Sequence, residues 1–143
     1  MSNPRLQKIL VPVDFTKKNK AALDYAKHLA HQNKSDLTLI HVIETIEYAD
    51  DEEVADFYEK LKKRSKTQLQ MLVDLLSADN INAEGKTVLG HRARGIVSYA
   101  MRHNMDLIVL SSHRIDPTEP AKSLSTLSYQ VSVLCQCPVL LVK

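Results

Sequence analysis

Cysteine is scarce in this sequence. Cys135 and Cys137 are the only two, and they stand two positions apart. Zinc sites and thioredoxin-like redox sites usually need a Cys-x-x-Cys spacing, so this pattern argues against both. We interpret the two residues as thiols packed near the core of a protein from a reducing compartment. The alternative is a Cys-x-Cys pair with a redox or metal-binding role.

Long hydrophobic runs are also missing. The longest apolar stretches span only a handful of residues, whereas a membrane helix needs about 20. Segment 1–8 carries charge but lacks the apolar centre and the small-residue cleavage site of a signal peptide. These features predict a cytoplasmic protein with no membrane partner.

Neither sign of charge predominates. The 19 basic and 17 acidic residues leave a net charge of +2, whereas nucleic-acid binders usually carry a basic stripe. We therefore expect no nucleic-acid partner. The 143 residues are 44% hydrophobic and 25% charged, which is typical of one soluble globular domain. We predict a single domain over residues 1–143.

Four strongly apolar runs indicate buried β-strands. They are rich in Ile, Val and Leu, and Pro, Ser and Asp residues bound them. A fifth run, 81–89, is weaker and more polar, as an edge strand would be. Strands that are apolar on both faces suit a parallel sheet covered by helices. In chain order, the five predicted strands span residues 6–13, 35–43, 81–89, 105–112 and 137–143.

Helical periodicity fills the intervals between these strands. Apolar residues recur there at steps of three and four, which gives each helix one apolar stripe. The stripes include Tyr25, Phe57, Met101 and Leu134. The predicted helices span residues 18–33, 51–78, 92–104 and 122–135. This alternation predicts an α/β fold, a three-layer doubly wound five-stranded parallel sheet with strand order 3-2-1-4-5 and helices on both faces.

Such a sheet binds ligands beyond the carboxyl ends of its strands, where the strand order reverses. Here that point lies between the first and fourth strands. Asp14 can accept hydrogen bonds from a ribose, the backbone of Val42 can pair with an adenine edge, and the start of the last helix attracts phosphate. An equally good interpretation of Asp14 is that it caps the first helix. The candidate nucleotide-binding residues are Pro12, Val13, Asp14, Val42, Ser111, Ser112, His113, Arg114, Ser125, Thr126 and Leu127.

Several strings resemble the universal stress protein family in order and spacing over nearly the whole chain. They are KILVPVDFT (8–16), DLTLIHVI (36–43), VLGHRARGIVSYAMRHNMDLIVLSSHR (88–114) and CQCPVLLVK (135–143). The resemblance implies an adenine nucleotide α-hydrolase-like fold, usually a homodimer, and a role in surviving starvation, oxidants or other stress.

Members of that family that bind ATP typically show a Gly-x2-Gly-x9-Gly-Ser/Thr pattern after the fourth strand. Here Ser111, Arg114 and Ser125 stand at the three glycine positions, and Thr126 follows with one extra residue in the spacer. Glycine lets the backbone approach a phosphate closely, and larger residues obstruct that approach. Two hypotheses follow: a remodelled crevice that still binds ATP or AMP, with or without magnesium, or a non-nucleotide protein that acts through a partner.

Catalysis and metal binding find less support. The chain has no P-loop and no Ser-based nucleophile elbow, so we expect no catalytic residue, although a slow ATPase is a third hypothesis. The six histidines show no tight ligand spacing and predict no metal site. We interpret most of them as surface or packing residues and keep only His113 as a crevice candidate.

The last strand offers a self-association surface. The run PVLLVK ends the chain, is almost wholly apolar, and is expected at an edge of the sheet. An uncovered apolar edge pairs readily with another strand. Antiparallel pairing of two such edges predicts a two-fold symmetric homodimer.

Overall fold

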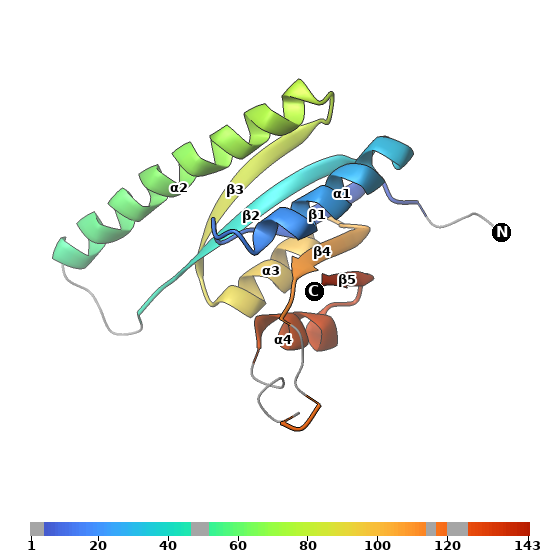
Figure 1. Cartoon of the computed structure of the whole chain (residues 1–143). Helices are drawn as coiled ribbons and strands as arrows, with labels where there is room; N and C mark the ends of the chain where they lie inside the picture. The colour runs from blue at the N-terminus through green and yellow to red at the C-terminus, as the bar shows by residue number, and fades with distance from the viewer. Residues whose placement is uncertain (1–4, 47–51, 114–116, 120–125) are drawn as a thin grey trace.

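The five predicted strands join in one parallel sheet in the computed structural model (Figure 1), which describes residues 5–46, 52–113, 117–119 and 126–143. The strand order is β3-β2-β1-β4-β5, as predicted, so β3 and β5 form the edges. The strands are β1 (Lys8–Pro12), β2 (Asp36–Glu44), β3 (Ala83–Gly90), β4 (Leu107–Ser111) and β5 (Val139–Val142).

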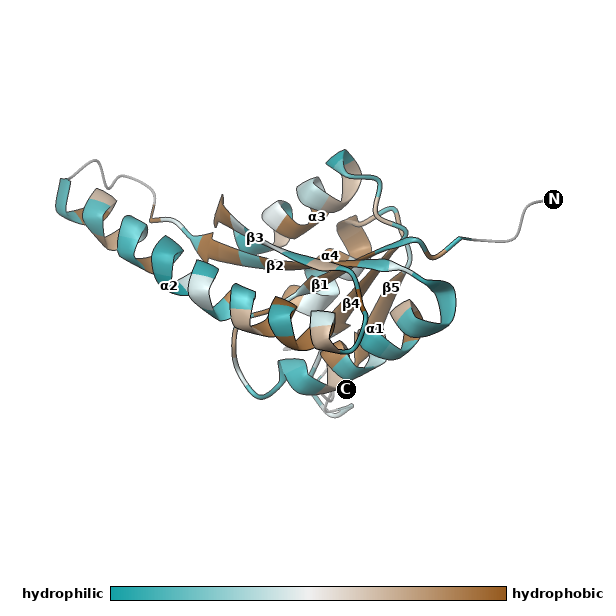
Figure 2. Cartoon of the chain, turned by 90° about the horizontal axis from the view of Figure 1, so that it is seen from above, coloured by the Kyte–Doolittle hydropathy of each residue, from teal (hydrophilic) through white to brown (hydrophobic). Residues whose placement is uncertain are grey.

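Helices cover both faces of the sheet. Figure 2 shows α1 and α2 on one side of the strands and α3 and α4 on the other. This arrangement confirms the predicted three-layer fold. Residues 122–125 of the last predicted helix lie outside the described residues. The helices are α1 (Asn19–Asn33), α2 (Glu52–Ala78), α3 (Arg92–Arg102) and α4 (Leu127–Leu134).

The central strands are buried on both faces. Ile9 and Val11 pack into the core beneath α1 and α2, while Leu10 packs into the second core beneath α3 and α4. All three side chains are fully buried. Successive side chains of a strand point to opposite faces. The apolar runs are therefore uninterrupted because helices shield both faces from water.

The first half of α2 extends beyond the sheet. A helix of 27 residues is about 40 Å long, whereas the 8 residues of β3 span roughly 27 Å. The buried positions of α2 begin only at Ser65, and Phe57 is 54% exposed. Figure 1 shows this overhang. The expectation that Phe57 lies on a buried stripe is wrong.

The buried stripes of the other helices are narrower than their periodicity suggested. Tyr25, Met101 and Leu134 are each more than half exposed, so their assignment to the stripes is wrong. Ala26 and Ala100 are buried instead. A neighbouring position on a helix is rotated by about 100°, so the residue next to a buried alanine turns toward solvent. Small side chains therefore bring these helices close to the sheet.

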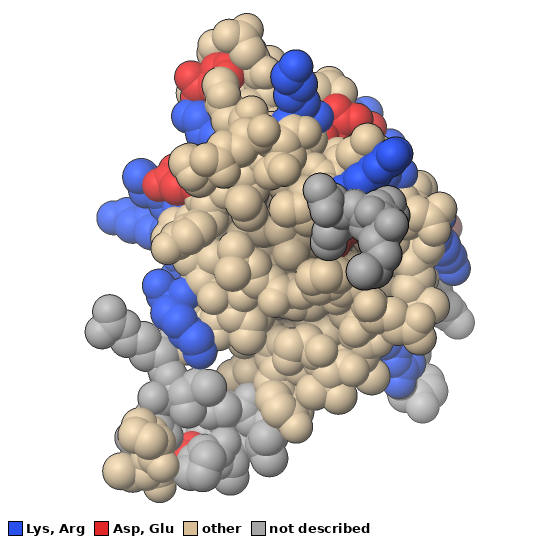
Figure 3. All heavy atoms as spheres, turned by 90° about the vertical axis from the view of Figure 1, so that its right-hand side faces the viewer, with Lys and Arg blue, Asp and Glu red and all other residues tan. Residues whose placement is uncertain are grey.

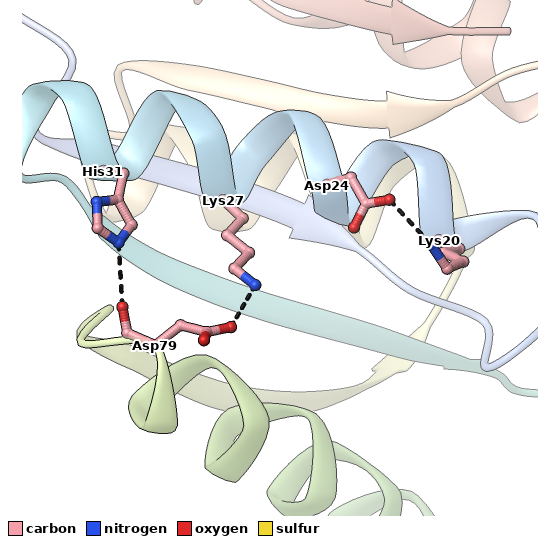
Figure 4. Close-up of polar contacts among 5 residues, drawn as sticks. All are labelled: Lys20, Asp24, Lys27, His31 and Asp79. Atoms are coloured by element: carbon pink, nitrogen blue, oxygen red, sulfur yellow. Dashed lines mark hydrogen bonds and ion pairs between the residues drawn. The ribbon is translucent and has the colours of Figure 1, made fainter.

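Polar contacts connect α1 to the end of α2 (Figure 4). Lys27 forms an ion pair with Asp79, and His31 Nε2 lies 3.1 Å from the Asp79 carbonyl oxygen. Lys20 and Asp24 form a second ion pair along α1. His31 is exposed, in agreement with its interpretation as a surface or packing residue. These exposed pairs contribute little to stability individually.

Charge is dispersed over the face shown in Figure 3. Lys and Arg side chains lie around its margin, several near Asp or Glu, and uncharged residues fill its centre. No helix within the described part of the chain is long and apolar enough to span a membrane.

Candidate functional site

The carboxyl ends of β1 and β4 lie side by side, because Ile9 pairs with Leu107 and Leu10 with Ile108. This is the predicted reversal of strand order. A narrow pocket of about 60 Å³ opens there, whereas small-molecule sites usually enclose roughly 300–1,000 Å³. Six of the predicted residues line it, namely Pro12, Val13, Asp14, Val42, Ser111 and Leu127.

Asp14 lies in the turn that leaves β1. The next residue, Phe15, has a left-handed φ of 65°, a strained conformation for a bulky side chain. Asp14 Oδ1 accepts hydrogen bonds from the Thr16 backbone N–H (3.0 Å) and hydroxyl (2.6 Å). Burial works to raise the pKa of Asp14, but these bonds and the positive charge of Arg92 together lower it below its usual value. The carboxylate is therefore ionised at neutral pH.

Asp14 is not the cap of the first helix. That helix begins at Asn19, and the residue before it, Lys18, makes no side-chain capping bond. The capping interpretation is wrong, and the Asp14 carboxylate instead closes a local turn with Thr16.

The backbone N–H and carbonyl of Val42 lie beyond the end of β1. The last backbone bond between these strands runs from the Val13 N–H to the Ile40 carbonyl, at 2.8 Å. Peptide groups alternate sides along a strand, so Val42, two residues further on, points its N–H and carbonyl toward the same side. Its side chain is buried against α3, where an added Cβ on Gly95 would lie 3.2 Å from Val42 Cγ2. The Val42 backbone is thus held rigidly at the pocket.

Asn19 connects the two strand ends, a role for which no sequence pattern provides a signal. Its side chain is buried. Asn19 Oδ1 accepts a bond from the Asp14 N–H (2.8 Å), and its Nδ2 donates to Ser111 Oγ (3.3 Å). Ser111 in turn donates to the Lys18 carbonyl (3.1 Å). Asn19 and Ser111 both line the pocket, so these bonds connect residues of its wall.

His41 and Arg92 also line the pocket. His41 Nδ1 lies 2.8 Å from the Val13 carbonyl oxygen, and its ring packs on Phe15 with centroids 4.6 Å apart. Arg92 is the first residue of α3 and contributes positive charge near Asp14. His41 was expected to be a surface or packing residue; it packs on Phe15, and it also forms part of the pocket wall.

A second polar group lies beside the pocket, at the start of α4. Thr126 is the N-cap of this helix and accepts a bond from the Tyr129 N–H. Ser112 Oγ lies 3.1 Å from Ser128 Oγ. His113 is exposed, and it is not among the residues that line the pocket.

Two of the predicted site residues, Arg114 and Ser125, lie outside the described residues. Within the described residues there is no group of three or more His, Cys, Asp or Glu side chains that could hold a metal ion.

A model of the universal stress protein family matches residues 5–143. The chain belongs to this family. It is 27% identical to the universal stress protein YxiE of Bacillus subtilis, over 95% of this chain and 98% of that protein. This finding confirms the resemblance that the sequence strings indicated.

Solved structures of universal stress proteins share the fold. UspA from Lactobacillus plantarum superposes with a TM-score of 0.82 at 22% identity, covering 99% of this chain and 100% of that one. A universal stress protein from Archaeoglobus fulgidus, solved in complex with dAMP, has a TM-score of 0.68 at 16% identity and covers 96% and 98%.

Proposed function

We propose that this universal stress protein binds an adenine nucleotide at the carboxyl ends of β1 and β4. The observation that carries the proposal is the open peptide of Val42, which lies at the same pocket as the ionised carboxylate of Asp14. The Val42 groups pair with the adenine edge, and Asp14 accepts from the ribose hydroxyls. The phosphates then extend toward the amino end of α4. The dAMP complex of the Archaeoglobus fulgidus protein supports this choice of ligand.

The pocket must widen before a nucleotide enters, since about 60 Å³ is too small for an adenine ring. The Asn19 and Ser111 bonds must open in that step. When only a fraction of the molecules has an open site, the apparent affinity equals the affinity of the open site multiplied by that fraction. We therefore expect the protein to bind AMP, ADP or ATP weakly.

Isothermal titration calorimetry with AMP, ADP and ATP, each with and without magnesium, tests the proposal. Asp14→Asn keeps the size of the side chain but removes its charge. A bond to a charged group contributes about 1.5–3 kcal/mol, so the variant should bind roughly 10- to 100-fold more weakly. Asp24→Asn is the matched control, because Asp24 is an exposed carboxylate of α1 that pairs with Lys20. No heat with millimolar nucleotide would refute the proposal.

We propose a binding and signalling role in the cytoplasm rather than catalysis. A general base works best when its pKa lies near the ambient pH. The pKa of Asp14 is lowered below its ordinary value, and so lies further from neutral pH. Incubating the protein with ATP and measuring released phosphate tests this role. Rapid turnover that Asp14→Asn abolishes would contradict it.

A second proposed property is a homodimer formed through β5. The Pro138 carbonyl accepts a bond from Ile108 of β4, and the Val142 carbonyl accepts one from Ser112, which follows β4. The peptide groups of Val139 and Leu141 therefore face the open edge. The three residues Val139–Leu141 remain partly exposed. On the adjacent α4, Val133 is 62% exposed. A second copy of the strand would cover this apolar edge.

Leu141→Pro tests that interface. Proline removes the outward N–H of Leu141 but no bond to β4, so the variant should be monomeric by light scattering. Leu141→Ala keeps the N–H and should remain dimeric. A wild-type protein that is monomeric at all concentrations, or a proline variant of unchanged dimeric mass, would argue against β5 pairing.

A further inference from the structure

Cys135 and Cys137 lie together where α4 leads into β5. Their sulfur atoms are 3.2 Å apart, within hydrogen-bonding distance. Cys135 is the C-cap that follows α4, and its N–H donates to the Val131 carbonyl (2.9 Å). The chain then bends through Gln136. The bend, and not the sequence spacing alone, brings the thiols into contact.

The thiols are accessible to a small reagent. Both side chains are partly buried and border a surface hollow of about 300 Å³, lined also by Ala100, Met101, Asn104, Met105 and Gln136. Cys137 precedes β5, so the hollow lies at the amino ends of the strands. The nucleotide crevice lies at their carboxyl ends. The two sites are therefore separate, and the chemistry of the thiols does not depend on nucleotide binding.

We propose that Cys135 and Cys137 form a redox-active dithiol that reduces small-molecule disulfides and closes a disulfide between its own sulfurs. A disulfide bond is about 2.05 Å long, so the sulfurs need to approach by only about 1.2 Å. A metal site is the weaker interpretation. The described residues bring no third His, Cys, Asp or Glu ligand to the pair, and structural zinc requires about four ligands.

In the proposed exchange Cys135 attacks first and Cys137 second. Burial and the neighbouring Cys135 raise the pKa of Cys137 to about 12, so Cys137 keeps its proton while Cys135 attacks. The Cys135 sulfur bonds to one sulfur of the small disulfide, and the first small thiolate leaves and takes up a proton. Cys137 then gives up its proton and attacks the Cys135 sulfur, which releases the second small thiol. The protein loses two hydrogens with their electrons, and the small disulfide gains them.

Oxidised glutathione is the probe for this exchange. The reduced protein is mixed with excess oxidised glutathione under anaerobic conditions with a chelator, and free thiols and intact mass are followed over time. We expect both thiols to disappear and the mass to fall by about 2 Da, with no glutathione retained and no covalent dimer. Persistence of both thiols would overturn the proposal, as would stable double glutathionylation or a disulfide between chains.

Two serine variants test the order of attack. Cys137→Ser should stop at one glutathione on Cys135, because no second thiol remains to release it. Cys135→Ser should react at least several-fold more slowly, because burial disfavours ionisation of the remaining Cys137 thiol. Equal rates for the two variants would overturn the assigned order. The wild-type mass measurement still decides the dithiol itself if either variant fails to fold.

Discussion

Replacing Asn19 with alanine should destabilise the protein by about 2 kcal/mol. The buried Asn19 side chain bonds to the Asp14 N–H and to Ser111 Oγ, and each bond contributes about 0.5–1.5 kcal/mol. The same change improves the helix propensity at the first position of α1 by about 0.5 kcal/mol. The net loss is therefore roughly 0.5–2.5 kcal/mol, and the loss of a partner by the partly buried Asp14 N–H places it in the upper part of that range.

Urea denaturation at pH 7 measures this loss. With a slope of about 2 kcal/mol/M, a 2 kcal/mol loss moves the midpoint down by about 1 M. Asn33→Ala is the matched control, because Asn33 is an exposed residue at the other end of α1 whose Nδ2 bonds only to the Leu29 carbonyl. Its effect should stay within about 0.5 kcal/mol. If Asn19→Ala costs no more than Asn33→Ala, Asn19 does not tie the strand ends together.

Two further predictions concern packing and pH. In Gly85→Ala the new Cβ would lie 2.9 Å from Leu69 Cβ, so we expect the free energy of unfolding in urea melts to fall by about 1–3 kcal/mol. The control Glu84→Ala, at the exposed neighbouring position, should lower it by about 0.5 kcal/mol or less. Equal effects would contradict the close approach of α2 to β3. Because the folded pKa of Asp14 lies below its ordinary value of 3.8, its contribution to stability is complete above pH 3.8 and is lost as the pH falls through the folded pKa. The difference in unfolding free energy between wild type and Asp14→Asn should thus be constant from pH 5 to 7 and smaller near pH 3. A difference that grows in acid would mean that the pKa of Asp14 is raised on folding, which would contradict this prediction.

The sheet could be predicted from the sequence because burial on both faces leaves an unmistakable apolar run. Ile108 and Val109, for example, are fully buried on opposite faces of β4. Helix stripes were predicted less well. Periodicity identifies a face of a helix but not how far the sheet beneath it extends. It therefore assigns Phe57 to the buried stripe, although α2 extends beyond β3 at this residue and leaves Phe57 exposed.

The crevice was predictable in position but not in shape. Parallel topology places Asp14 and Ser111 at adjacent strand ends, whatever the loops do. The bonds of Asn19 arise only when α1 brings its first residue against β4, a contact between residues 92 positions apart. His41 likewise faces the pocket because β1 ends before β2 does. No local pattern signals such contacts.

Ser111, which the sequence resemblance places at the first glycine of the ATP-binding pattern, gives a physical reason for the narrow pocket. Ser111 Oγ accepts from Asn19 and donates to the Lys18 carbonyl, and a glycine would make neither bond. Ser111→Gly should therefore open the pocket more readily. If opening becomes about 1 kcal/mol easier, the apparent affinity for AMP or ATP rises roughly fivefold while the open state remains the minor one. The unfolding free energy should fall by a similar amount. Calorimetry and urea melts on one preparation measure both quantities. Tighter binding with lower stability would show that the serine holds the crevice closed, whereas weaker binding by the glycine variant would show that the hydroxyl contacts the nucleotide.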